Sequence, residues 1–378
     1  MVMSLHTNMH VHARSPETRI FKEVMPIYAR DNYLVMPVVN LPEKTTYELI
    51  ENYWTSTKDI TFKVNPRCHV KLMIALDDGL TAESLDNILM CCKKRGAEIG
   101  GAKLFPRGQS TNAGNAAPLS LAFTFFPVLA KYGIPLNLHM EHPDTWDVTE
   151  KEADFVRDIL PKISKEASKS NLRIVLEHIS TKESVDYIKA HSDTMCTITP
   201  HHMLFCLEDL GIQKEDDVEA VLRKKFQFAF CKPTPQWRDN MTAVKNFFKS
   251  GSPQIMLGSD SAPHKESAKL SPDPSMRPAG VYIEDVRGAY IRALVGDVAS
   301  EKEVNIAKSL LRRYDMNAVQ YYAPELTKAY ALEYYMPRPV GMEQASFTPA
   351  VLPFKAGQGA IIDGLGKYMS YRDAQRGR

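Results

Sequence analysis

The 378-residue sequence has little net charge and lacks the long apolar runs of a membrane protein. The formal net charge is +2, and no basic run is interleaved with aromatic residues, so we do not expect a nucleic-acid partner. No window approaches ~20 consecutive apolar residues, which argues against a transmembrane helix. The N-terminal stretch has neither the charged start nor the apolar core of a signal peptide. We therefore expect a cytoplasmic protein with no membrane partner.

The cysteines lack the spacing of a metal-binding or redox motif. They are scattered and form no CxxC pair, so we expect reduced thiols and no zinc site built from cysteine. The six residues are Cys68, Cys91, Cys92, Cys196, Cys206 and Cys231.

Short β-rich runs alternate along the chain with longer amphipathic stretches. Several of the β-rich runs are continuously apolar, as expected for strands that are covered on both faces. We predict strands at 4–12, 33–38, 69–76, 101–105, 134–139, 174–178, 194–199 and 254–260. We predict helices near 17–30, 46–57, 82–95, 119–132, 148–169, 181–191, 238–250 and 280–296.

This alternation predicts an α/β fold of the (β/α)8 TIM-barrel type. A doubly wound open sheet is the alternative, although no GxGxxG follows any strand, which disfavours its dinucleotide-binding version. We expect one barrel domain over residues 1–378. Within it, the irregular Tyr- and Pro-rich tail at 330–378 is expected to be a C-terminal extension packed on the barrel.

The first candidate site lies at the end of the first predicted strand. His10 and His12 share one face of that strand, and Arg14 can continue this face as the strand ends. Buried polar groups need partners, and a metal ion would be a partner for two imidazoles. Taken alone, such a pair is more often two hydrogen-bonded surface histidines than a metal site.

Further polar residues follow other predicted strands. Each has an ordinary explanation as a hydrogen-bonded strand end, an edge lysine or a turn residue. In a parallel barrel, however, all the strands deliver their carboxyl ends to one mouth, where these side chains would meet. Histidine and carboxylate ligands suit zinc or a similar divalent ion, and the set is large enough for two metals. The residues are Lys103, His139, His178, Asp260 and His264.

Lys103 is the unusual member of this set. As an ammonium it would repel two cations, whereas as a neutral amine it could take up carbon dioxide and bridge both ions as a carbamate. A lysine that anchors a phosphate is the competing role.

In order along nearly the whole chain, the sequence resembles the shorter, bacterial-type class of the dihydroorotase family, within the amidohydrolase superfamily. HxH is a weak mark of the superfamily, whereas the later motifs in series are more specific. The resemblance is carried by "HVHAR" (10–14), "AKLFP" (102–106), "LHMEHPD" (138–144), "LEHISTKES" (176–184), "TITPHHM" (197–203) and "GSDSAPHKES" (258–267), with "PAGVY" (278–282) and "LPFKAGQ" (352–358).

The resemblance implies two zinc ions per chain. His10, His12, Lys103 and Asp260 would hold one zinc, and His139 and His178 would hold the other together with the same lysine, carboxylated on its amine. Asp260 would also be the general acid and base. The implied reaction is the reversible cyclisation of N-carbamoyl-L-aspartate to L-dihydroorotate, a step of pyrimidine synthesis, and the family suggests a homodimer.

The resemblance also implies substrate contacts. The substrate carboxylate would bind Arg14 and His264, further contacts would come from Asn40 and from the backbone at Lys232 and Ala279, and a mobile loop would cover the substrate with Ser110 and Thr111. The family places its asparagine directly after "MP", whereas this chain reads "VMPVVNLP", so Asn40 takes this role only if the loop is shifted. Lys232 occupies a position that is often apolar.

Other functions stay open. An allantoinase or hydantoinase would act on a related cyclic amide, although a neutral amide would not need Arg14. A catalytically silent barrel that serves as an assembly partner is a second alternative, against which the complete set of ligands argues. The remaining histidines are assigned no catalytic role: His6, His69, His191 and His201 are expected to be hydrogen-bonded or surface groups, and His142 and His202 to be structural.

Overall fold

The computed structural model describes residues 6–109, 113–283, 285–296 and 299–333. Parallel strands form its centre, in the order β1-β2-β4-β5-β6-β7-β8-β9, and β3 adds a short pairing to β2. The strands are β1 (His6–Val11), β2 (Asn32–Val39), β3 (His69–Val70), β4 (Leu72–Ala75), β5 (Ile99–Leu104), β6 (Leu136–Leu138), β7 (Ile174–Leu176), β8 (Met195–Ile198) and β9 (Ile255–Leu257).

The first and last strands meet, so the sheet closes into a barrel. The amide of Asp260 donates to the carbonyl of His10 at 2.9 Å, and the amide of His12 donates to the carbonyl of Ser261 at 2.9 Å. Val11 and Ser261 form an isolated parallel bridge between these bonds. The (β/α)8 prediction is therefore confirmed, and the open doubly wound alternative is wrong.

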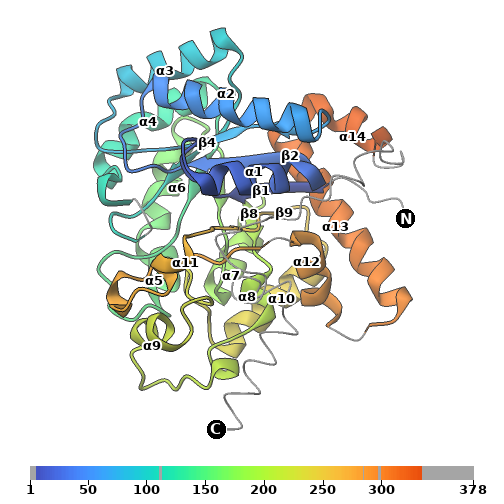
Figure 1. Ribbon diagram of the computed structural model, residues 1–378. Helices are drawn as coiled ribbons and strands as arrows, with labels where there is room; N and C mark the ends of the chain where they lie inside the picture. Colours follow the sequence, from blue (N-terminus) through green and yellow to red (C-terminus); the bar gives the residue numbers. More distant parts are fainter. Residues whose placement is uncertain (1–5, 110–112, 284, 297–298, 334–378) are drawn as a thin grey trace.

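Helices surround the sheet on its outside (Figure 1). Four of them start at a threonine whose side chain accepts a backbone N–H of the first turn: Thr18, Thr46, Thr81 and Thr181. The α-helices are α1 (Arg19–Asp31), α2 (Tyr47–Val64), α3 (Ala82–Arg95), α4 (Leu119–Lys131), α5 (Lys151–Asp158), α6 (Leu160–Ser168), α7 (Lys182–Ala190), α8 (His201–Leu204), α9 (Val218–Lys225), α10 (Arg238–Lys249), α11 (Glu266–Lys269), α12 (Val286–Val295), α13 (Glu301–Tyr322) and α14 (Thr327–Glu333). Short 3-10 turns lie at Ala113–Asn115, Glu208–Leu210, Pro274–Met276 and Pro324–Leu326.

Every predicted strand overlaps an observed one, but two of the predicted helical stretches differ in the structure, and some helices were not predicted. The stretch 148–169 holds two helices, and Pro161, which has no N–H to donate, stands in the first turn of the second. The stretch 280–296 is helical only from Val286, because Val281 extends the barrel edge by pairing with Ser261. Helices α9 and α13 are not among the predicted elements.

The side chains of the strands point alternately outward, towards the helices, and inward, into the barrel. Alternate strand residues such as Leu136 and Leu138 pack outward against the helices, whereas Asn137 points into the barrel and donates to Glu177. Helix α13 packs against β1 and β9 (Figure 1). Its Asp315 accepts from the amide of Thr7, at the start of β1, at 2.8 Å. The amino ends of these strands are thus covered, and the carboxyl ends are left to form a site.

The structure bears only partly on the expected absence of membrane helices and on the expected C-terminal extension. Among the described helices, none is both long and apolar enough to cross a membrane. The predicted C-terminal extension falls almost entirely outside the described residues, since helix α14 ends at Glu333. The single-domain organisation over residues 1–378 therefore stays a prediction.

Candidate metal and substrate site

Three of the predicted ligands meet where the barrel closes. The Nε2 atoms of His10 and His12 lie 3.3 Å apart, as expected for alternate residues on one face. Asp260 Oδ1 lies 3.4 Å from His10 Nε2 and 3.2 Å from His12 Nε2. The three residues are buried, and their donor atoms all lie within 4.8 Å of one another. The backbone bonds that close the barrel therefore also hold this cluster together.

A second pair of histidines lies beside this cluster. His139 follows β6 and His178 follows β7, and His139 Nδ1 lies 3.1 Å from His178 Nε2. The ring of His178 is also 5.2 Å from the ring of His10, measured between centroids. The strand ends therefore bring all four predicted imidazoles into one continuous group.

Two buried glutamates set the orientation of these rings. His10 Nδ1 donates to Glu177 at 2.9 Å, so its Nε2 faces the cluster, and His139 Nε2 donates to Glu141 at 2.6 Å, so its Nδ1 faces His178. Carboxylates that hold the outer nitrogen of an imidazole fix its tautomer and raise its basicity as a ligand. Glu141 and Glu177 are not among the predicted site residues, although each lies within two residues of a predicted histidine.

Lys103 projects from β5 into the same interior and is fully buried. Among the described residues its amine has no hydrogen-bond partner, and the ring of Phe105 lies 5.5 Å away. Burial lowers the pKa of Lys103 to about 8, although the charges of Glu177 and Asp260 oppose this change. A buried amine without a partner is costly unless it is neutral or chemically modified.

The charges around the cluster favour neutral imidazoles and ionised carboxylates. Burial lowers the pKa of His12 to about 4, against the opposing effect of Asp260, and burial and the charge of Lys103 lower the pKa of His178. Burial alone would raise the pKa of Asp260, but His10 and His12 hold this pKa well below its usual range. These are the protonation states in which histidine and aspartate bind metals.

A pocket opens directly beside Asp260. Its lining includes Arg14, Asn40, Lys232 and Ala279, four of the residues predicted to contact substrate. Asn40 follows β2 and reaches the pocket although it does not stand directly after the Met-Pro pair.

Arg14 is anchored at the pocket wall. Its Nε donates to the carbonyl of Pro263 at 2.7 Å, and its Nη2 lies 2.9 Å from His264 Nε2. That same Nε2 lies 2.7 Å from the carbonyl of Ala279. One imidazole nitrogen cannot accept from Arg14 and donate to Ala279 at once, so only one of these hydrogen bonds forms at a time.

Comparison with known proteins identifies the family, although no protein-family model matches the sequence. A dihydroorotase of Shewanella pealeana is 28% identical over 278 residues, covering 69% of this chain and 71% of its own length. A dihydroorotase of Coxiella burnetii is 30% identical over 261 residues, covering 68% of each chain. The chain belongs to the dihydroorotase family.

The same fold occurs in a solved dihydroorotase. The structure of the Saccharomyces cerevisiae enzyme in complex with 5-fluoroorotic acid superposes with a TM-score of 0.70 and 23% identity, over 85% of each chain. At this identity the superposition shows the shared barrel architecture, and the roles of individual residues depend on the geometry given above.

Not every residue expected from the dihydroorotase resemblance can be located. Ser110 and Thr111, predicted to cover the substrate, lie outside the described residues. Among the histidines without an assigned role, His191 hydrogen-bonds the Tyr187 carbonyl at its own helix end, at 2.8 Å. His201 and His202 are buried beside Cys231, in a group that shares no residue with the cluster around Asp260.

Proposed function

We propose that this member of the dihydroorotase family catalyses the reversible cyclisation of N-carbamoyl-L-aspartate to L-dihydroorotate. The observation that carries the proposal is the buried group of His10, His12 and Asp260, which opens into a pocket lined by Arg14. Family membership adds independent support, since relatives from several organisms carry the name dihydroorotase.

We propose a two-zinc centre. One ion would be held by His10, His12 and Asp260 and the other by His139 and His178, with a carboxylated Lys103 shared by both. The unpartnered, buried amine of Lys103 fits this role, because a carbamate would replace an isolated positive charge by two ligand oxygens. Imidazole and carboxylate donors fit zinc, while cobalt and manganese use the same ligands. When bound, two such ions would supply a water acidified to a near-neutral pKa and would polarise the amide carbonyl.

Asp260 is proposed as the general acid and base. In ring opening its ionised carboxylate would accept the proton of the attacking water and deliver it to the departing ring nitrogen. Its low pKa keeps the carboxylate ionised before the reaction, and its place in the lining of the substrate pocket gives it access to the reacting bond. In ring closure the same proton moves in the opposite direction.

Arg14 and His264 are proposed to bind the substrate carboxylate. A guanidinium can grip a carboxylate through two parallel hydrogen bonds, and a neutral cyclic amide would not need this contact. The carboxylate would also accept a hydrogen bond from His264. The Nε2 of His264 would then no longer be shared between Arg14 and the Ala279 carbonyl. Asn40 and the backbone at Lys232 and Ala279 are proposed as further contacts, with Ser110 and Thr111 closing over them.

An assay with matched substrates tests this function. Purified protein is incubated with L-dihydroorotate, allantoin and a hydantoin, and the metal content is measured by elemental analysis. We expect turnover of dihydroorotate and at least two ions per chain. Preference for allantoin or a hydantoin would favour the related cyclic amidases, and a metal-free, inactive protein would favour a silent assembly partner.

The carbamate has its own test. We expect Lys103→Ala to lose most of its activity and to regain part of it when small carboxylic acids are added, because these can replace the bridging group. Full activity of the unsupplemented variant would end the carbamate proposal. A cytoplasmic homodimer, which the family resemblance suggests, also stays a proposal. The molar mass in solution, measured by light scattering, tests the dimer.

A further inference from the structure

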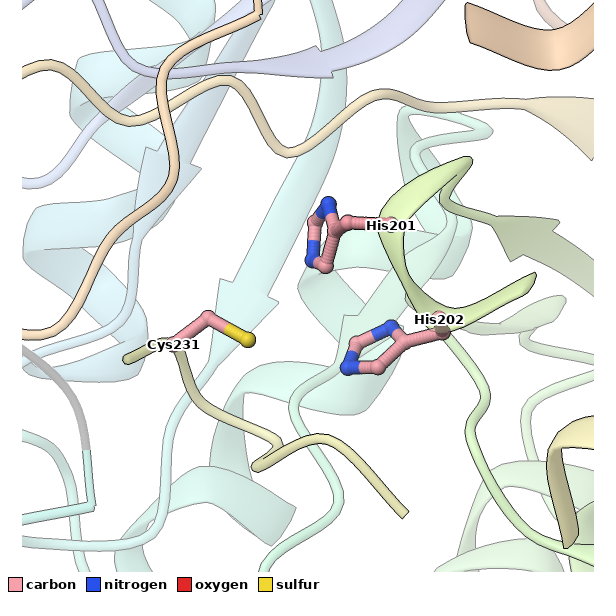
Figure 2. Close-up of side chains that lie close together, drawn as sticks. All are labelled: His201, His202 and Cys231. Atoms are coloured by element: carbon pink, nitrogen blue, oxygen red, sulfur yellow. The ribbon is translucent and has the colours of Figure 1, made fainter. Parts of the chain in front are cut away.

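A second cluster of metal-ligand residues lies outside the proposed two-metal centre. It consists of His201, His202 and Cys231, whose donor atoms all lie within 4.8 Å of one another (Figure 2). The residues are 1%, 3% and 1% exposed, so water does not reach them freely. They share no residue with the group formed by His10, His12 and Asp260.

Two separate parts of the chain build this cluster. His201 and His202 open helix α8, directly after β8, and Cys231 comes from the segment that follows α9. Because the cysteine is remote in sequence from the histidines, no short motif announces the group, and the spacing of the cysteines predicts no zinc site. Only the fold brings the thiol beside two imidazoles, as Figure 2 shows.

His201 is the member of the cluster whose polar atoms lack hydrogen-bond partners. Both of its ring nitrogens are buried, and neither has a hydrogen-bond partner among the described residues. Leaving a buried polar group unpaired costs about 1–3 kcal/mol, and native proteins rarely accept this cost without a ligand or ordered water. The ring lies 4.5 Å from the ring of His202, measured between centroids, and therefore borders the other two donors.

The other two donors converge on one carbonyl. His202 Nε2 donates to the carbonyl of Pro233 at 2.9 Å, and Cys231 Sγ donates to the same oxygen at 3.2 Å. Both atoms thus direct a proton to one small region, and a cation there would replace both protons. Thr199 Oγ1 lies 2.6 Å from His202 Nδ1 and would hold the outer nitrogen of the ring, as is usual for a metal-bound imidazole.

We propose that His201, His202 and Cys231 form a further metal site, for zinc or a similar borderline-soft divalent ion. Two imidazoles and one thiolate match the nitrogen and sulfur donors that zinc prefers, and they do not suit calcium or magnesium. Tetrahedral zinc keeps its ligand atoms about 3.5 Å apart, so small side-chain rotations would close the cluster around the ion. The Pro233 carbonyl or a water would complete the coordination.

An ion at this site would support the wall of the substrate pocket. It would tie helix α8 to the segment 231–233, and Lys232 in that segment lines the pocket together with Arg14 and Asp260. The ion itself would lie behind this wall. We therefore expect it to act on the position of the backbone at Lys232 and not on the reacting bond.

Cobalt titration of the metal-depleted full-length protein tests the site without reference to activity. A cobalt–thiolate bond produces a charge-transfer absorption in the near ultraviolet, which nitrogen and oxygen ligands alone do not produce. We expect this band to appear in the wild-type protein, and its final intensity to correspond to one thiolate-bound cobalt ion per chain in addition to the ions of the two-metal centre. If wild-type protein saturated with cobalt lacks the band, the proposal is refuted without any variant.

Matched variants assign the band to this cluster. Cys231→Ser should abolish the band and remove one bound ion, and His201→Asn should weaken cobalt binding at this site more than tenfold. Cys206→Ser is the control thiol, because Cys206 is also buried but donates to Asp209, and this variant should keep the band. Lys103→Ala should keep it too, whatever the outcome for the two-metal centre. Persistence of the band in folded Cys231→Ser, verified by circular dichroism, would overturn the proposal.

Discussion

Replacing Lys103 by methionine should stabilise the metal-free protein while it removes activity. The wild-type amine is fully buried and has no hydrogen-bond partner among the described residues. Methionine has a similar length and fills irregular apolar space, and it carries no charge. The substitution therefore removes the burial cost of the ammonium and leaves the surrounding packing nearly unchanged.

The size of the effect follows from the pKa of Lys103. Burial lowers this pKa from 10.5 to about 8, and the difference corresponds to about 3 kcal/mol between the charged amine in the folded and in the unfolded chain. The charges of Glu177 and Asp260 oppose the lowering and are already included in this value. We therefore expect Lys103→Met to raise the free energy of unfolding by up to about 3 kcal/mol at pH 7.

The gain should depend on pH in one direction. Below pH 8 the amine is protonated in both states, so the folded wild-type chain bears the full cost. Between about pH 8 and 10.5 the folded state has released its proton and the unfolded state has not, so the stability of the wild type rises with pH. The advantage of Lys103→Met should shrink across this interval and vanish above it.

Urea unfolding of chelator-treated protein in buffers free of carbon dioxide measures this advantage. Lys63→Met is the matched control, because Lys63 is exposed on α2 and should contribute nothing to the difference. If Lys103→Met is less stable than the wild type at pH 7, or if its advantage does not change between pH 8 and 10, then the buried amine carries no such cost. The same result would weaken the case for its modification.

Three further substitutions test other parts of the site. Glu177→Gln should lower metal affinity about 10- to 100-fold in a chelator competition, because His10 loses the carboxylate that fixes its tautomer; unchanged affinity would contradict this role. Arg14→Met should raise KM for dihydroorotate about 10- to 100-fold with a smaller effect on kcat, since charge-assisted hydrogen bonds are worth about 1.5–3 kcal/mol; an unchanged KM would show that the carboxylate binds elsewhere. Asp260→Asn should retain part of its metal but lose about 10²- to 10⁴-fold in kcat in steady-state assays, and normal turnover would exclude Asp260 as the acid and base.

The candidate residues at the strand ends could be predicted because a barrel brings many individually weak candidates to one place. Lys103, His139 and His178 each have an ordinary explanation alone, but eight parallel strands deliver such residues to one mouth. Apolar runs located the strands, and strand periodicity placed His10 and His12 on one face, where their Nε2 atoms lie 3.3 Å apart. The geometry of the cluster therefore follows from the register of the first strand and from the closure of the barrel.

Glu177 could not be predicted in the same way. In a regular strand Glu177 and His178 would point to opposite faces, so one of the two would be expected to leave the site. The strand β7 already ends at Leu176, and His178 adopts a positive φ of 41°, which breaks the alternation. Both side chains consequently turn towards His10, one as its hydrogen-bond acceptor and the other as its neighbour.

Helix α13 was not predicted, although its sequence has the features of a helix. Its buried residues recur with helical spacing, among them Leu311, Asp315 and Val319, and Ser300 with Glu303 forms a capping box at its start. Eight strands with their helices already completed the expected architecture by residue 296. The helix lies outside that repeat and covers strand ends opposite the site, so its role became evident only from its contacts.

Left-handed backbone conformations are concentrated in the proposed site. Four non-glycine residues in the described chain have a left-handed backbone, and three of them, Arg14, His178 and Asp260, belong to the proposed site. Such conformations cost about 1–3 kcal/mol each and persist only where surrounding bonds enforce them. The amide of Asp260 is held by the His10 carbonyl, and the amide of His178 donates to Thr197 at 2.8 Å. Glycine would relieve the strain at each position, but it would supply neither the proposed ligands nor the guanidinium, so the proposed roles account for the retained strain.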